Sequence, residues 1–298
     1  MNPTPAASVV IPVLNGAATL DELLVALKAQ VGVAGGFEII VVDNGSTDRT
    51  TEIVRAHGAT LMHQPVRGPS AARNLGLAQA RAEILVCTDA DTIPTRRWLA
   101  ALLSAFADPE TMQATGPIHG WQPTTAAERF ACARKVFDCQ KTARHPLHPF
   151  AIGMNHAVRR SAAREIGGWD ETMTSGEDVD FGIRMNQRFA APIHFVEQAV
   201  LFHRHRSDDE ALWKQARWHG AGFALVRRRH SASFPWTAWE SGVVRASLLA
   251  MHVTGPLVRL GRALRLLNAR RAEFERYHIG WTRHFWAGYF EQWRKLSS

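Results

Sequence analysis

The sequence predicts an α/β fold in which helices flank a mostly parallel central sheet and a helical extension follows at the C-terminus. The first half of the chain alternates short β-branched runs with helical patterns, which is typical of doubly wound sheets. The length of 298 residues leaves room for about two domains. The last third of the chain differs from the rest in charge and tryptophan content.

The predicted strands are short apolar runs separated by helix patterns. Residues 8–14 and 37–43 are typical of strands that are covered on both faces. Between them, leucines recur at helical spacing, at Leu20, Leu23, Leu24 and Leu27. The alternation continues with a helix after Asp48, a strand at 59–63, a helix entered through Ser70 and a strand at 83–88. We also expect a strand at 193–202.

Charge is distributed unevenly along the chain, whose formal total is +8. Residues 1–202 hold 18 Lys and Arg against 20 Asp and Glu, whereas residues 203–298 hold 17 against 7. Seven of the ten tryptophans also lie in the last third. We therefore expect a main α/β domain over residues 1–206 and a basic, tryptophan-rich helical extension over residues 207–298.

Two patterns in the extension predict amphipathic helices. Residues 243–267 combine aliphatic positions with Arg245, Arg259, Arg262 and Arg265. An aromatic face then recurs every three or four residues, at Phe274, Tyr277, Trp281, Phe285 and Tyr289. Basic residues beside apolar faces are attracted to anionic bilayer surfaces, which favours peripheral membrane association. The alternative is that these faces pack on the main domain or on a second subunit.

Composition and sequence patterns also indicate the cellular compartment in which the protein is expected. Three cysteines, at Cys87, Cys132 and Cys139, are too few for a disulfide framework and indicate a reducing compartment. The first residues lack the basic and apolar regions of a signal peptide. The sequence contains no run of about 18 uncharged apolar residues, so we expect no membrane-spanning helix. We expect a cytoplasmic location, which includes the inner face of a membrane.

Polar residues follow three predicted strands of the sheet. The first strand ends in Pro12-Val13-Leu14-Asn15-Gly16, the second in Asp43-Asn44-Gly45-Ser46-Thr47-Asp48, and a later one in Asp89-Ala90-Asp91. Ligands bind outside the carboxyl ends of strands in such sheets. Taken singly, each segment is also explained by turn and helix-capping chemistry. Together, at one predicted edge, they indicate a functional site.

The type of site follows from which residues are present and which motifs are missing. Neither G-x-G-x-x-G nor G-x-x-x-x-G-K-[ST] occurs, so a dinucleotide fold and a P-loop are not supported. Asp89 and Asp91 instead offer two carboxylates at a strand end. Such oxygen ligands suit Mg²⁺ or Mn²⁺, which proteins commonly hold with one or two carboxylates plus substrate phosphates.

A second acidic motif occupies residues 166–182. Glu177 and Asp178 are expected in the first turn of a helix, where the helix dipole alone favours acids. Three acids among four residues nevertheless repel one another unless a partner is supplied. Downstream, His203 stands at the end of a predicted strand and is a candidate imidazole ligand for a metal.

Four segments together resemble the family-two glycosyltransferases of the GT-A fold, over about residues 8–205. They are VVIPVLN, EIIVVDNGSTD, GPSAARNLGLAQARAEILVCTDADT and GGWDETMTSGEDVDFGIRM. The resemblance implies a base and ribose site lined by Pro12, Asn15 and Asp43, with Arg73 facing the diphosphate. It implies an Asp-x-Asp motif at Asp89 and Asp91, with Asp91 nearest the metal, and a Glu-Asp catalytic motif at Glu177 and Asp178. By the same resemblance, His203 completes the metal site.

The implied reaction moves one sugar from a nucleotide-diphosphate sugar, for which a UDP-sugar is the first choice, to an acceptor hydroxyl. Mn²⁺ or Mg²⁺ would stabilise the leaving diphosphate. Asp178 would accept the acceptor's proton, and in-line displacement would invert the anomeric centre. The processive Gln-x-x-Arg-Trp motif is one residue short at 215–218, which favours single transfer. The expected acceptor is a glycan or a lipid-linked molecule, as in cell-envelope synthesis.

Other classes of protein remain as alternatives. A retaining GT-A transferase or a nucleotidyltransferase would also use acids at strand ends with a divalent metal. The basic, tryptophan-rich third would suit a nucleic-acid-binding protein. The slightly acidic residues 1–202 argue against nucleic acid as a partner. A non-catalytic sugar-binding module is disfavoured because both acidic motifs are intact.

Overall fold

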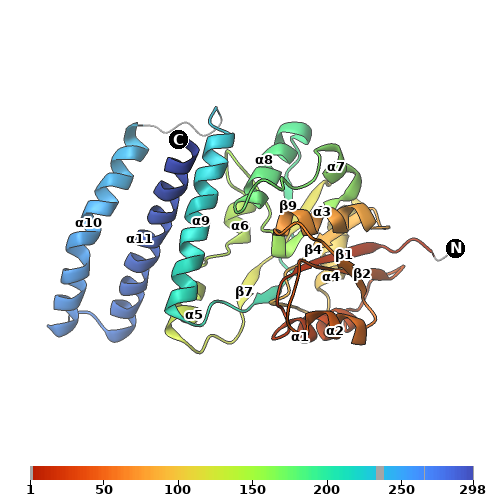
Figure 1. Ribbon diagram of the computed structural model, residues 1–298, viewed down its shortest axis with the longest axis horizontal. Helices are drawn as coiled ribbons and strands as arrows, with labels where there is room; N and C mark the ends of the chain where they lie inside the picture. Colours follow the sequence, from red (N-terminus) through yellow and green to blue (C-terminus); the bar gives the residue numbers. More distant parts are fainter. Residues whose placement is uncertain (1–2, 233–237, 265, 298) are drawn as a thin grey trace. The chain divides into compact units, whose positions relative to one another are not determined.

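The computed structural model describes residues 3–232, 238–264 and 266–297. These residues form two compact units. The first comprises Met1–Trp121 and Val136–Arg204, and the second comprises Gln122–Lys135 and His205–Ser298. Figure 1 labels the α-helices of both units and some of the strands. The expected functional division between residues 206 and 207 stays a prediction.

A seven-stranded sheet forms the centre of the first unit, in the order β3-β2-β1-β4-β8-β6-β9. Its strands are β1 (Ala7–Val13), β2 (Phe37–Asp43), β3 (Thr60–His63), β4 (Ile84–Cys87), β6 (Gln113–Thr115), β8 (His156–Arg159) and β9 (Ile193–Phe195). The four strands from β3 to β4 run parallel, whereas β8 is antiparallel to both β4 and β6. The prediction of a mostly parallel sheet flanked by helices is confirmed.

Strand β1 shows why the apolar runs are nearly continuous. Val9 and Ile11 belong to the hydrophobic cluster on one face of the sheet, and Val10 belongs to the cluster on the other. All three side chains are fully buried. Successive side chains of a strand point to opposite faces, so a strand covered on both sides must be apolar at every position.

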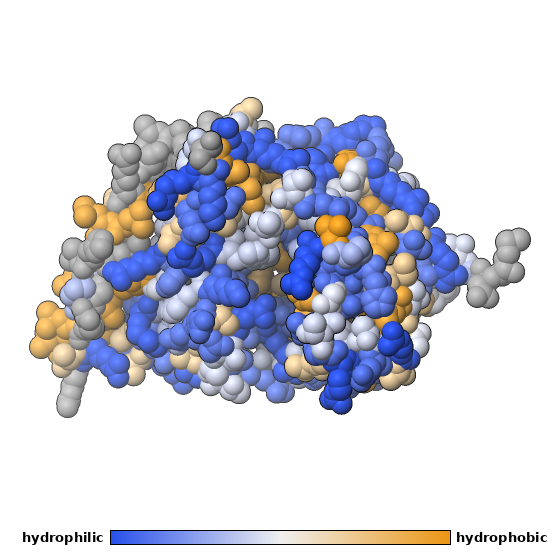
Figure 2. Space-filling model, viewed as in Figure 1, coloured by the Kyte–Doolittle hydropathy of each residue, from blue (hydrophilic) through white to orange (hydrophobic). Residues whose placement is uncertain are grey.

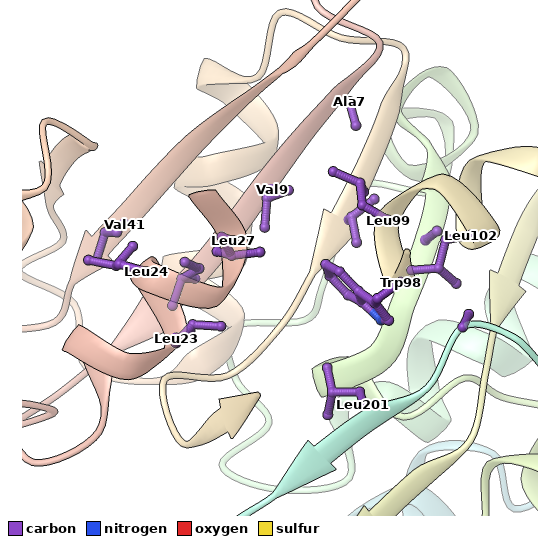
Figure 3. Packing of buried hydrophobic residues seen from close by; sticks show 14 of the residues in the cluster. Ala7, Val9, Leu23, Leu24, Leu27, Val41, Trp98, Leu99, Leu102 and Leu201 are labelled. Carbon is purple, nitrogen blue, oxygen red and sulfur yellow. The ribbon is translucent and has the colours of Figure 1, made fainter. Parts of the chain in front are cut away.

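Helices cover both faces of the sheet (Figure 1). On the first face lie α1 (Leu20–Lys28), α2 (Thr50–Ala56) and α4 (Trp98–Ser104). On the second lie α3 (Pro69–Gln79), α7 (Arg160–Glu165) and α8 (Glu177–Phe189). Figure 3 shows part of the first cluster, with Leu23, Leu24 and Leu27 of α1 and the Trp98 ring of α4. The buried Trp98 Nε1 donates a hydrogen bond to Asn155 Oδ1 at 2.8 Å.

A smaller sheet contains β5 (Thr92–Pro94), β10 (Leu201–His203) and β7 (Ile118–Gly120), in that order. The expectation of one strand over residues 193–202 is wrong, because β9 and β10 lie in different sheets. A turn separates them, in which the Ala199 N–H donates to the Val196 carbonyl. The turn contains Glu197 and Gln198, which are exposed and interrupt the apolar pattern at this point. The remaining short elements of this unit are α6 (Cys139–Ala143), η1 (Ala105–Ala107) and η2 (Gly153–Asn155).

The second unit is helical, as the sequence predicts. It contains α5 (Ala126–Arg134), α9 (Asp209–Arg229), α10 (Ala238–Ala263) and α11 (Ala269–Ser297). Helices α9 and α11 touch through their backbones. A Cβ atom added at Gly220 would lie 1.9 Å from the Phe285 carbonyl oxygen, and one at Gly288 would lie 2.1 Å from the Arg217 carbonyl oxygen. Both positions therefore need glycine for this approach.

The predicted aromatic face of α11 packs inside the helical unit. Tyr277, Trp281 and Tyr289 are buried. The Phe130 ring of α5 stacks on Tyr277 at 5.5 Å. This face therefore packs on α5 and α9 of the same unit. Its three buried side chains are not exposed to a bilayer. Of the four predicted arginines, Arg262 is exposed, whereas Arg265 and the side chains of Arg245 and Arg259 lie outside the described residues.

Within the described ranges, no helix combines the length and the apolar character needed to cross a membrane.

The packing of α3 on β1 predicts that Gly76→Ala destabilises the protein. The added Cβ would lie 2.3 Å from Val10 Cγ1, and Val10 is fully buried. Overpacking of this kind typically costs about 1–3 kcal/mol. Urea unfolding should show this loss. Gly242→Ala in α10, where the added Cβ meets nothing within 4 Å, is the control and should show no loss. Equal stability of the two variants would contradict the packing argument.

Candidate active site

The carboxyl ends of β1, β2 and β4 lie at one edge of the sheet, because these strands are parallel neighbours. Val13, the last residue of β1, pairs with Asp43, the last residue of β2. Val10 of β1 pairs with Cys87, the last residue of β4. The polar segments that follow these strands therefore start at the same edge, as the sequence predicts.

Arg73 of α3 joins three acidic side chains that are distant in sequence. Its Nη1 atom lies 2.9 Å from Glu177 Oε1 and 3.3 Å from Asp178 Oδ1, and its Nη2 atom lies 3.3 Å from Asp89 Oδ1. The Arg73 side chain is only 3% exposed. The structure thus brings together four of the predicted site residues in one cluster, which we call the Arg73 cluster.

The position of Asp178 depends on two local features. Gly176, with φ of +78°, takes the left-handed conformation that starts α8 and places Glu177 and Asp178 in its first turn. The backbone N–H of Gly153 donates to Asp178 Oδ2 at 2.8 Å. A Cβ atom at position 153 would lie 2.6 Å from Arg73 Nη2 and 2.7 Å from Asp178 Oδ1. Gly153 therefore allows the guanidinium and the carboxylate to meet.

Burial and charge act in opposite directions on the Arg73 cluster. Burial raises the pKa of Asp178 to about 7, although the Arg73 guanidinium lowers it. Burial likewise raises the pKa of Asp89 against the effect of Arg73. Desolvation opposes the charge on Arg73, but the surrounding carboxylates raise its pKa above the usual value. Asp178 remains 19% exposed, so water reaches the carboxylate that is expected to exchange a proton.

Asp91 and His203 form a second pair at this edge. His203 Nε2 lies 3.5 Å from Asp91 Oδ2, and the Arg204 N–H donates to the Asp91 carbonyl. The Phe137 ring packs edge-on against the His203 imidazole at 4.9 Å. Among the described residues, no group of three or more His, Cys, Asp or Glu side chains is placed to hold a metal ion. The pair supplies two donors, so a bound divalent ion would need phosphate or water oxygens as its other ligands.

The predicted base and ribose residues occupy the turns after β1 and β2. Asn15, with φ of +52°, accepts a hydrogen bond from the Thr47 N–H at 2.8 Å. Asp43 is buried and accepts one from the Ser46 N–H at 3.1 Å. Pro12 lies one residue before the end of β1. In the described part of the chain, no hydrogen bond or ion pair connects Asn15 or Asp43 to the Arg73 cluster.

The third acid of the 177–180 segment has a partner of its own. Asp180 is fully buried, and Arg184 pairs with it at 2.8 Å one turn later in α8. Arg73 and Arg184 together supply the compensating charge that three neighbouring acids require. The two arginines thereby offset the repulsion expected among Glu177, Asp178 and Asp180.

Sequence reasoning missed several residues that position the site. Asn74 donates to the Trp169 carbonyl at 2.7 Å and accepts from the Trp169 N–H at 2.8 Å, which ties α3 to the loop before α8. Thr92 donates to the Asp89 carbonyl at 2.7 Å and supports the Asp-x-Asp turn. The Ala-Arg-Asn sequence at 72–74 was the available signal for Asn74. Gly153 contributes its backbone N–H to the site, and no pattern of side chains in the sequence indicates this role.

Comparison with known proteins identifies the family of this chain. The model of the family described as glycosyl transferase family 2 matches residues 8–167. Pre-mycofactocin glycosyltransferase from Mycobacterium tuberculosis is 31% identical over 272 residues, which cover 88% of this chain. This chain spans 55% of that relative's length, or about half.

Two solved structures resemble the fold. The mannosyltransferase PcManGT from Pyrobaculum calidifontis, in complex with GDP-Man and Mn²⁺, has a TM-score of 0.69 at 22% identity, covering 97% of this chain and 87% of its own. Glucosyl-3-phosphoglycerate synthase from Mycobacterium tuberculosis, in complex with Mn²⁺, UDP and glucosyl-3-phosphoglycerate, has a TM-score of 0.54 at 25% identity, covering 76% of this chain and 80% of its own.

The fold is that of the GT-A glycosyltransferase class. The chain belongs to glycosyl transferase family 2, since the family model spans more than half of it. The expectations of fold, family and enzyme type drawn from the four sequence segments are confirmed.

The Arg73 cluster predicts a pH-dependent loss of stability in Arg73→Met. Without the cation, the pKa values of Asp89 and Asp178 rise further above those of the unfolded chain. Raised carboxyl pKa values give stability that is present at low pH and lost as the pH rises through the folded pKa. Removing one partner of a buried ion pair typically costs about 3–5 kcal/mol. The loss in unfolding free energy should therefore be larger at about pH 8.5 than at about pH 5.

The control is Arg81→Met, which removes a half-exposed partner of Glu38. An exposed ion pair is worth about 0–1 kcal/mol, so this variant should stay close to the wild type. A loss in Arg73→Met that is independent of pH, or no larger than in Arg81→Met, would contradict the assignment of Arg73 as the central cation.

Proposed function

We propose that the protein transfers one sugar from a nucleotide-diphosphate sugar to an acceptor hydroxyl, with inversion at the anomeric carbon. The observation that carries this proposal is the Arg73 cluster beside the Asp91–His203 pair. Three carboxylates surround one arginine there, and a fourth, that of Asp91, faces the His203 imidazole. A diphosphate would add further negative charge, so this edge suits a donor that arrives with a divalent cation.

The donor is expected to lie along the carboxyl edge of the sheet, in a catalytic domain over residues 1–206. Pro12, Asn15 and Asp43 would line the base and ribose site, and Arg73 would face the diphosphate. Asp89 would contribute to donor binding beside Asp91. We take a UDP-sugar as the first candidate, since the synthase at 25% identity was solved with UDP, although PcManGT was solved with GDP-Man.

Mn²⁺ or Mg²⁺, held by Asp91 and His203 together with donor phosphates, would stabilise the charge on the leaving diphosphate. The carboxylate–imidazole pair suits such an ion because the two side chains already face each other at 3.5 Å.

Asp178 would act as the general base. Its Oδ2 atom is held by the Gly153 N–H and its Oδ1 atom by Arg73, so the carboxylate has a fixed orientation. Partial exposure lets an acceptor hydroxyl approach it. A base on the face opposite the leaving group supports a single displacement, which inverts an α-linked donor to a β-linked product. NMR of the product's anomeric proton distinguishes this from retention, and release of pyrophosphate would indicate nucleotidyl transfer.

Asp178→Asn should lower turnover by about 10²- to 10⁴-fold while donor affinity stays nearly unchanged, because the amide keeps the shape but accepts no proton. In the wild type, kcat/KM should rise with pH through about 7, where Asp178 ionises. Steady-state kinetics and donor titration measure both. Glu177→Gln and Asp180→Asn are the comparison variants. Near wild-type turnover in Asp178→Asn would move the base to one of these two residues.

Activity should require Mn²⁺ or Mg²⁺ and disappear in excess EDTA. Asp91→Ala should weaken metal-dependent donor binding more than His203→Ala, because an anionic oxygen binds a hard cation more strongly than a neutral imidazole does. A thermal-shift titration with UDP-, GDP- and dTDP-sugars, with and without Mn²⁺, measures this binding. Full activity in EDTA would overturn the metal assignment.

We also propose that the helical unit holds the enzyme on the inner face of a membrane, where a lipid-linked acceptor or a cell-envelope glycan is presented. Leu257 and Leu260 lie three residues apart in α10 and are exposed, and the exposed Leu264 directly follows the last residue of this helix. Figure 2 shows hydrophobic residues gathered over this helix. Exposed leucines on a strongly basic unit suit an anionic bilayer surface. A second copy of the chain is the other partner that such a face would fit.

Co-sedimentation with anionic liposomes should fall in Leu257→Ser/Leu260→Ser, because the variant buries less apolar area in the bilayer. The control is Val25→Ser/Leu147→Ser, which removes exposed apolar residues from the α/β unit. Equal recovery of the wild type in the supernatant with anionic and zwitterionic vesicles at low salt would remove the membrane role. Light scattering would then test for a dimer.

A further inference from the structure

A pocket of about 550 Å³ lies within the helical unit, between α9, α10 and α11. All its lining residues belong to this unit, and none of them belongs to the unit that holds Asp178. Its polar lining comprises Arg262, Arg276, Arg283, His284 and Asp209. The proposed transfer reaction gives this pocket no role.

Charge in the pocket is unbalanced in favour of cations. Among the described lining residues, three arginines lie at the cavity with one acid, Asp209, which accepts a hydrogen bond from the Tyr277 hydroxyl and lies 3.8 Å from Arg276. Arg262 is exposed and shows no ion pair among the described residues. Cations gathered around one concave site attract an anion to it, even where solvent screens each charge in part.

The walls of the pocket are apolar and aromatic. The Trp213 and His284 rings stack in parallel, with centroids 5.4 Å apart. Val258 and Ile279 add aliphatic surface. These rings and aliphatic side chains give the cavity apolar walls beside its arginines.

From this combination we infer that the pocket binds a ligand with a phosphate group and an apolar portion. The planar guanidinium of arginine forms paired hydrogen bonds with phosphate oxygens, and a phosphate dianion compensates more positive charge than a carboxylate does. The apolar walls would hold the remainder of the ligand. The head of a lipid phosphate and a soluble phosphate ester share this chemistry.

Hexyl phosphate, inorganic phosphate and hexanoate are the probes, titrated calorimetrically against the full chain without any sugar donor. Hexyl phosphate should bind at least about tenfold more tightly than either of the others, a difference of about 1.4 kcal/mol. Hexanoate binding as tightly as hexyl phosphate, or no binding of hexyl phosphate, would overturn the inference. Because no donor is present, the result does not depend on the proposed transfer chemistry.

Arg262→Gln/Arg283→Gln is the test variant, since Arg276 also pairs with Asp209. It should weaken hexyl phosphate binding at least about tenfold. Arg270→Gln/Arg294→Gln removes the same charge from exposed positions of α11 outside the pocket and should leave binding within about twofold. Circular dichroism and melting temperature check that both variants fold. Equal weakening of hexyl phosphate binding in the two variants would indicate a nonspecific attraction to the basic helices. It would overturn the inference of a phosphate site in the pocket.

Vesicles of phosphatidylcholine with and without phosphatidic acid identify the source of the ligand. A loss of phosphatidic acid binding in Arg262→Gln/Arg283→Gln alone would support a lipid headgroup. Vesicle binding that is unchanged in this variant, with weakened hexyl phosphate binding, would support a soluble phosphate ester. Vesicle binding could instead depend on Leu257 and Leu260, while the arginine variant leaves hexyl phosphate binding unaffected. This result would support membrane association and overturn the inference of a phosphate site in the pocket.

Discussion

A single buried cation holds the candidate active site together. Arg73 gives one guanidinium to acids from the segment after β4 and from the start of α8, and its own helix comes from a third part of the chain. Burying a charge is unfavourable unless partners compensate it. The elements that carry those partners must therefore reach their positions together. The acid cluster and the orientation of Asp178 are consequences of the same electrostatic constraint.

The parallel sheet explains why that constraint can be met. Parallel strands bring their carboxyl ends to one edge, and each strand end is followed by a loop that can change without disturbing the core. The two apolar clusters secure the strands from both faces. The site can then combine a rigid frame with side chains from distant segments. The smaller sheet places His203, the last residue of β10, beside Asp91, which directly precedes β5.

Much of this arrangement was readable from the sequence. Val9, Val10 and Ile11 predict a strand covered on both faces, and the acids at 89, 91, 177 and 178 predict the edge where the site lies. The break between β9 and β10 was not predicted, although Glu197 and Gln198 stand between them, because strand propensity does not show which strand each segment pairs with. The burial of the aromatic face of α11 was equally hidden, since amphipathicity does not name the partner. Gly153 acts through its backbone N–H, and no residue pattern reports that.

Gly153 also affects how this site can vary. Any side chain there would have to occupy space already taken by Arg73 and Asp178. The position should consequently tolerate as little change as the acids themselves, although it contributes no side-chain chemistry. Among diverging copies of this enzyme, a substituted residue 153 would mark a chain that has lost the paired arginine and carboxylate, even where both residues persist in its sequence.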